Sequence, residues 1–117
     1  NAMKIEFNRE KFLAAFQIAS AMAPVRSPKG ILTYVKLDAT GPDVIMMATD
    51  SDAGVRIKIE DVVVTTPGKV LFPVARMGNI LRENGDERLT VTLTDNSVDV
   101  RGANAEFHLP VANADEY

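Results

Sequence analysis

The sequence predicts an α+β domain in which two helices pack on one side of antiparallel sheet. Two segments have the period of amphipathic helices, and the shorter segments around them alternate between apolar and polar residues as strands do. The order strand, helix, strand, strand, strand occurs twice along the chain. The domain is therefore predicted to be a βαβββ unit used twice.

The first unit opens with an alternating strand over residues 3–7 and a helix over residues 9–22. Asn8 supplies a side-chain oxygen that can cap the start of this helix, and Pro24 ends it. Its wide apolar stripe consists of Phe12, Phe16, Ala19 and Ala23, flanked by Leu13, Ala15, Ile18 and Met22. Only a narrow side is left for solvent, formed by Glu10, Ala14 and Gln17. Three strands are expected next, over residues 31–39, 44–49 and 55–59.

The second unit repeats this order after a short strand over residues 70–73. A helix is expected over residues 76–83, followed by strands over residues 89–93, 98–101 and 105–111. Three polar residues at helical spacing lie opposite the apolar side of this helix, so they are expected to point out of the core together: Arg76, Asn79 and Arg82. An ordinary solvated helix face would have the same pattern.

Composition limits the possible functions. The 117 residues include no cysteine, which excludes disulfides, thiolate zinc sites and cysteine nucleophiles. No apolar run approaches the roughly 18 residues of a membrane span, and the start has no signal-peptide pattern, so we expect a soluble, cytoplasmic protein without a membrane partner. Asn1 and Ala2 are interpreted as a remnant of cloning, and residues 3–117 as the domain. The formal net charge of −3 means that any DNA contact must come from a local basic patch.

Catalysis is not expected. Asp50 and Asp52 could form a carboxylate pair or bind a metal, but a turn between two strands is the commonest place for aspartate. His108 is the only histidine and has no partner in a recognisable nucleophile motif. We therefore predict no cofactor and no metal. A small acid hydrolase using these three residues is the enzymatic alternative, and it would show pH-dependent turnover.

Several short motifs follow each other along the chain. They are an opening strand and helix over residues 3–22, an arginine-bearing loop that leads into an Ile-Leu strand over residues 26–32, a Thr49-Asp50 turn, and Pro73 followed by Arg76 and Arg82. In this order and spacing the sequence resembles the beta subunit of bacterial DNA polymerase III, the sliding clamp, from Met3 onward.

The resemblance implies a DNA-clamp fold and a chain that is the first of about three domains. Two such subunits would form a head-to-tail homodimeric ring around double-stranded DNA, with helices lining the hole. The ring would tether the replicative polymerase to its template as a processivity factor without chemistry of its own. DNA polymerase III and the clamp loader would bind mainly through domains that this chain lacks.

The resemblance also implies which residues face DNA: Arg26, Arg76, Asn79, Arg82 and Gln17. Two departures from the family pattern weaken this assignment on the side of the first helix. Gly30 stands where the family usually has a proline, so the loop that carries Arg26 can follow another path. Ala14 stands where the family commonly has a lysine. Solvated side chains without a DNA role remain the alternative.

Phe107 and Leu109 lie on the last strand, which in the family pairs with the other subunit. This resemblance assigns them to the subunit interface. Because they are two residues apart on one face of a strand, they could equally be core residues. A standalone interaction module that self-associates through this edge strand is the alternative function.

Overall fold

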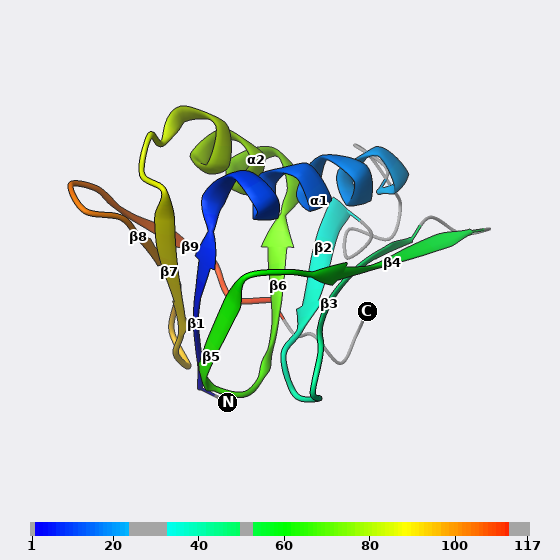
Figure 1. The fold of residues 1–117 in the computed structure, drawn as a ribbon, viewed down its shortest axis with the longest axis horizontal. Coiled ribbons are helices and arrows are strands. Elements are labelled where there is room, and N and C mark those ends of the chain that lie inside the picture. Colours follow the sequence, from blue (N-terminus) through cyan, green and yellow to red (C-terminus); the bar gives the residue numbers. More distant parts are fainter. Residues whose placement is uncertain (1, 24–32, 50–52, 113–117) are drawn as a thin grey trace.

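The helices and strands of the domain form two layers (Figure 1). The computed structural model describes residues 2–23, 33–49 and 53–112. Both helices lie on one side of the molecule, and the strands lie below them in two antiparallel sheets. In chain order the elements are β1 (Met3–Asn8), α1 (Arg9–Met22), β2 (Tyr34–Asp38), β3 (Val44–Thr49), β4 (Gly54–Ile59), β5 (Val62–Thr66), β6 (Lys69–Pro73), α2 (Val74–Glu83), β7 (Arg88–Leu93), β8 (Val98–Arg101) and β9 (Glu106–Leu109).

The two repeated units exchange their first strands. Sheet A has the strand order β5-β1-β7-β8-β9, and sheet B has the order β4-β3-β2-β6. β1 of the first unit therefore pairs with β7 of the second, and β6 of the second unit pairs with β2 of the first. This exchange joins the two units into one hydrophobic core, because side chains from both sheets and both helices pack together.

Helix α1 has the predicted bounds, and a local contact explains where it begins. The Asn8 side chain accepts a hydrogen bond from the Lys11 backbone N–H at 3.0 Å, which caps the first turn. The helix buries Phe12, and this ring stacks on Phe7 with 4.0 Å between the ring centroids and meets Phe72 edge-on at 6.0 Å. Helix α1 is thus anchored to β1 and β6 through aromatic contacts.

One predicted member of the apolar stripe of α1 is wrong. Ile18 is 59% exposed, although sequence patterning placed it on the flank of the stripe. Six residues separate it from Phe12, which at about 100° per residue puts it about 120° around the helix from the centre of the stripe. The core contacts of α1 do not extend that far.

Helix α2 begins at Val74, two residues earlier than predicted, directly after Pro73. It buries Met77, Gly78, Ile80 and Leu81. Arg9 connects the start of α1 to the end of α2: its Nη1 donates to the Leu81 carbonyl at 3.0 Å and its Nε donates to the Asp86 carbonyl at 2.7 Å. The first of these bonds satisfies a carbonyl in the last turn of α2, which has no partner within the helix. The two helices are therefore held side by side.

The strand β5 was not predicted. Its five residues are all β-branched, and it pairs antiparallel with β1, with Ile5 opposite Val64. The turn before it contains Asp61, whose positive φ of 58° reverses the chain so that β5 joins sheet A rather than extending β4. Strand β2 is shorter than the predicted range 31–39, of which residues 31 and 32 lie outside the described part, and β9 is shorter than the predicted range 105–111.

Neither helix in the described part of the chain is long and apolar enough to cross a membrane.

Candidate nucleic-acid interface and edge strand

The outward side of α2 carries a group of polar side chains. Arg76, Asn79 and Arg82 are all exposed, as the helical spacing predicts. Arg82 Nη2 donates to Asn79 Oδ1 at 2.7 Å, which aligns the guanidinium along the helix. Among the described residues, neither arginine forms an ion pair with a carboxylate. Both positive charges are therefore available to an anionic ligand such as a phosphate group.

The backbone of α2 makes room for the Arg82 side chain. A Cβ atom added at Gly78 would lie 3.1 Å from Arg82 Nη1, so the guanidinium passes close over this glycine. Arg82 also lies in the last turn of the helix, where the helix dipole favours a positive charge. The position of Arg82 thus has a structural contribution in addition to any role in binding.

The outward side of α1 carries different side chains from the outward side of α2. Gln17 is exposed, as predicted, and its neighbours on this side are Ala14 and Ile18. The one lysine of the helix, Lys11, lies 3.9 Å from Asp61 Oδ2, so its charge is partly compensated. The same side also carries the exposed and acidic Glu10, while Ala14, Gln17 and Ile18 are uncharged, so it offers little attraction to a phosphate backbone.

Three candidate residues from the sequence lie outside the described residues. Arg26, predicted to face DNA, is one of them, and Asp50 and Asp52, weighed as a carboxylate pair, are the others. Within the described part, no three acidic or histidine side chains come together in a way that could hold a metal ion.

The last strand, β9, forms one edge of sheet A. Leu109 is 2% exposed and belongs to the core, whereas Phe107 on the same face is only partly buried. Of these two side chains, Phe107 alone has surface left for a partner. Arg76 of α2 reaches this edge, where its Nη2 donates to the His108 carbonyl at 3.0 Å. Nothing in the spacing of the sequence indicated this contact, because the two residues are 32 positions apart.

His108 forms a charged cluster on the outer face of sheet A. Its Nδ1 lies 2.6 Å from Asp99 Oδ1 and its Nε2 lies 3.5 Å from Glu106 Oε2. The hydrogen bond to Asp99 raises the pKa of His108 above its ordinary value of 6.5, and the same bond lowers the pKa of Asp99. The Ser97 hydroxyl donates to Asp99, not to His108. The histidine therefore cannot activate this serine as it would in a Ser-His-Asp triad.

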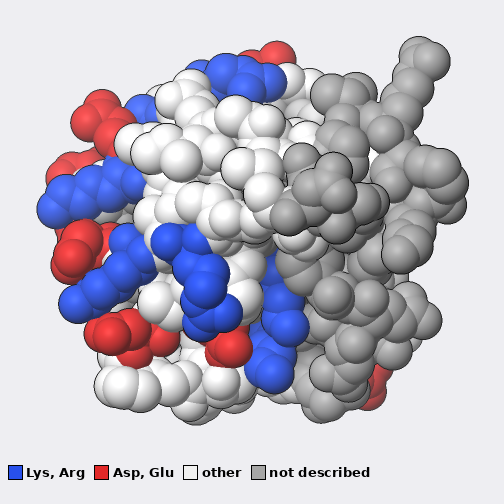
Figure 2. Space-filling view, turned by 90° about the vertical axis from the view of Figure 1, so that its right-hand side faces the viewer, with Lys and Arg blue, Asp and Glu red and all other residues white. Residues whose placement is uncertain are grey.

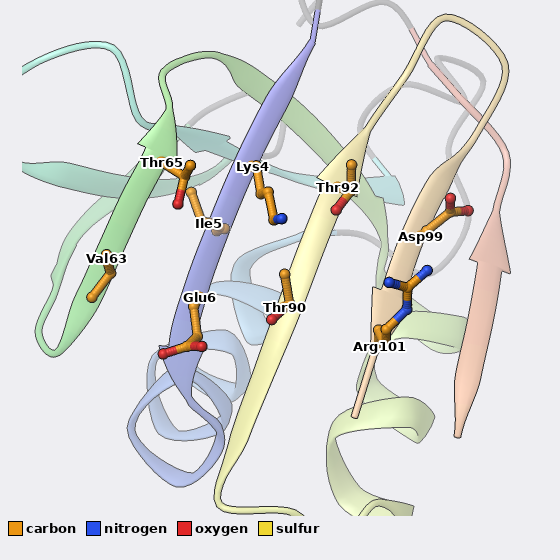
Figure 3. Close-up of a pocket in the computed structure, with 9 residues that line it drawn as sticks. All are labelled: Lys4, Ile5, Glu6, Val63, Thr65, Thr90, Thr92, Asp99 and Arg101. Carbon is orange, nitrogen blue, oxygen red and sulfur yellow. The ribbon is translucent and has the colours of Figure 1, made fainter. Parts of the chain in front are cut away.

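A hollow of ≈ 330 Å³ lies on the outer face of sheet A (Figure 3). The residues that line it stand on β5, β1, β7 and β8 and include charges of both signs: Lys4, Ile5, Glu6, Val63, Thr65, Thr90, Thr92, Asp99 and Arg101.

Positive charge is not confined to α2. Figure 2 shows a flank of the molecule on which Lys and Arg side chains alternate along one border with Asp and Glu side chains. On the outer face of sheet B, Lys36 and Arg56 lie on either side of Met47, and Lys58 lies 3.5 Å from Asp43. The alternation of Arg56 and Lys58 with apolar residues was visible in the sequence, but its place in the sheet was not.

Comparison with known proteins is consistent with this fold. The family described as DNA polymerase III beta subunit, N-terminal domain, matches residues 3–117. A search of curated protein sequences finds no match.

Three solved structures illustrate the likeness. The DNA polymerase sliding clamp from Bacillus subtilis is 22% identical with a TM-score of 0.94, and the match covers 100% of this chain and 33% of that one. The DNA polymerase sliding clamp from Caulobacter crescentus is 22% identical with a TM-score of 0.90, covering 98% and 32%. The DNA polymerase III beta chain from Streptococcus pneumoniae is 18% identical with a TM-score of 0.91, covering 98% and 32%. The chain thus spans about a third of the length of these proteins.

Proposed function

Because the chain belongs to the DNA polymerase III beta subunit family as an N-terminal domain, matched over residues 3–117, we propose that it is the first of about three domains of a DNA sliding clamp. The clamp would be a head-to-tail homodimeric ring that encircles double-stranded DNA. It would act as a non-catalytic processivity factor in the cytoplasm. DNA polymerase III and the clamp loader would bind it mainly through the other domains.

The observation that carries this proposal is the contrast between the net charge and the outward side of α2. A chain with a net charge of −3 is a poor DNA binder by bulk electrostatics. Arg76 and Arg82 nevertheless present two positive charges from one helix, and no described carboxylate pairs with either. A ring that holds DNA by topology needs only a few such contacts, because weak phosphate contacts permit sliding.

The first test is the length of the native protein. An antibody raised against this domain should detect, by immunoblot of source cells, a polypeptide about three times as long as the chain, since the chain spans 32–33% of the clamps that it matches. A native polypeptide that ends near Tyr117 would contradict the clamp proposal and favour a self-associating module.

The second test is topological retention. The full-length protein, loaded onto nicked circular DNA in an extract of source cells, should stay with the DNA through gel filtration. Linearising the DNA with a restriction enzyme should release it, because a ring slides off a free end. Equal retention on linear DNA would indicate ordinary groove or backbone binding and would contradict encirclement.

The subunit interface is proposed to form along β9, with Phe107 as its apolar contact. Leu109 was predicted as a second contact, but its side chain is buried in the core, so its replacement would disturb folding as well as pairing. Phe107→Ala in the full-length protein should raise the dimer dissociation constant, with folding stability measured alongside. Unchanged dimerisation would remove Phe107 from the interface.

A further inference from the structure

The edge of β9 has only a few backbone groups that a partner strand could use. The Gly102 N–H donates to the Ala105 carbonyl at 2.9 Å, which makes this pair a hydrogen-bonded one at the end of the β8–β9 hairpin. Bonded and non-bonded pairs alternate in an antiparallel ladder. Glu106 and His108 are therefore in non-bonded pairs with β8, opposite Arg101 and Asp99, and their backbone N–H and C=O groups point away from the sheet.

Arg76 already occupies one of these outward groups. Its Nη2 lies 3.0 Å from the His108 carbonyl oxygen, the acceptor that a strand added to β9 would need. Because Arg76 comes from the first turns of α2, its guanidinium lies where the helical layer meets the edge of sheet A. One carbonyl is thus placed between two possible donors, a side chain of the same chain and a backbone N–H of a partner.

We propose that Arg76 caps the unpaired edge of β9 and is released when a second subunit pairs with that edge. The released guanidinium then turns to the outward side of α2, beside Arg82, and contacts a DNA phosphate. Closure of the ring and binding of DNA are then coupled through the Arg76 side chain. The inference rests on the proposed clamp function and adds a regulation of its interface.

Arg82 provides the contrast that makes the proposal testable. It lies on the same side of the same helix, but its guanidinium bonds to Asn79 of its own helix and not to β9. Pairing of a second subunit with the β9 edge therefore leaves the hydrogen bond of Arg82 to Asn79 unchanged. The two arginines should have similar effects on DNA binding and different effects on dimerisation.

The direction of the dimerisation effect follows from competition. The bond from Arg76 to the His108 carbonyl stabilises the unpaired chain, so its removal favours the paired state. An exposed hydrogen bond from a charged donor corresponds to about a threefold to tenfold change in an equilibrium constant. The ring has two such interfaces, so Arg76→Ala should lower the dimer dissociation constant by this factor twice over, about tenfold to a hundredfold in all.

The experiment compares the wild-type full-length protein with Arg76→Ala and Arg82→Ala. Dimer dissociation constants are measured by analytical ultracentrifugation, and the salt dependence of DNA affinity is measured on short linear duplexes, where topology does not retain the ring. We expect tighter dimerisation for Arg76→Ala only, and for both variants a salt slope lower by about 0.9, the value of one phosphate contact.

The failures of the two proposals can be told apart. If the wild type forms no dimer and is not retained on circular DNA, the clamp proposal fails and this inference fails with it. If the wild type behaves as a clamp but Arg76→Ala dimerises equally or more weakly, only the capping inference is overturned. An Arg76→Ala salt slope equal to that of the wild type would likewise overturn it, because Arg76 would then not reach DNA in the closed ring.

Discussion

Helices α1 and α2 occupy equivalent places in the two repeated units, yet they expose different chemistry. Helix α1 covers the core with aromatic side chains and shows Ala14, Gln17 and Ile18 on its outward side. Helix α2 buries aliphatic side chains and a glycine and shows Arg76 and Arg82. The repeated topology constrains the buried sides, because they must fill one shared core. It leaves the outward sides free to differ, and in this chain the unpaired positive charge of the helical layer lies on α2.

The largest expected effect tests α1 as the structural helix. Phe12 is fully buried and contacts rings on β1, α1 and β6, so Phe12→Ala should lower the free energy of unfolding by about 3–5 kcal/mol. Ile18→Ala on the same helix is the matched control and should change it by less than about 0.5 kcal/mol, because Ile18 is 59% exposed. Urea unfolding measures both, and a similar loss for the two variants would contradict the contrast between the sides of α1.

The next effect tests α2 as the DNA-facing helix. Arg82→Ala in the full-length protein should shorten residence on DNA and lower the salt slope by about 0.9, since one phosphate contact is lost. Urea unfolding of the same variant controls for the loss of a favourable charge at the end of the helix, which costs about 0.3–1 kcal/mol. A salt slope equal to that of the wild type would exclude Arg82 from the contact with DNA.

A smaller effect is expected when charge is added to α1. Ala14→Lys places a cation on the outward side of α1, four residues after Glu10, and should raise the salt slope by less than the 0.9 of a full contact, because the Glu10 carboxylate partly compensates the new charge. Ala14→Gln is the neutral control of similar length. If Ala14→Lys leaves residence and salt slope unchanged, α1 does not face DNA. The assignment of Gln17 as a DNA-facing residue would then also be wrong.

The smallest effect concerns pH at the β9 edge that α2 contacts. The pKa of His108 is raised by its bond to Asp99, so the stability that His108 contributes is present below pH 6.5 and is lost as the pH rises through its higher folded-state value. The pKa of Asp99 is lowered in the folded state. The stability that Asp99 contributes is therefore present above its ordinary pKa of 3.8 and is lost as the pH falls through the lower folded-state value. His108→Asn should abolish the decline in unfolding free energy above about pH 6.5. An NMR titration of the imidazole gives an independent measure, and a pKa at or below 6.5 would rule out the ion pair.

Much of the secondary structure was predictable because its signals are local. The bounds of α1 followed from Asn8, Pro24 and a stripe of apolar residues at helical spacing, and the outward side of α2 followed from residues three apart. Strand β5 was missed although its five β-branched residues are typical of a strand. Its neighbour in sheet A, β1, lies more than fifty positions away, and no local pattern indicates that pairing.

The sequence by itself determined the α+β class, the two βαβββ units and the polar side of α2, because side-chain period and capping act over a few residues. The tertiary structure decided which strands meet, with β1 and β6 exchanged between the units. It also decided that Leu109 lies in the core and that Arg76 reaches the His108 carbonyl. These contacts join residues far apart in the chain, and such contacts form only when the whole core is assembled.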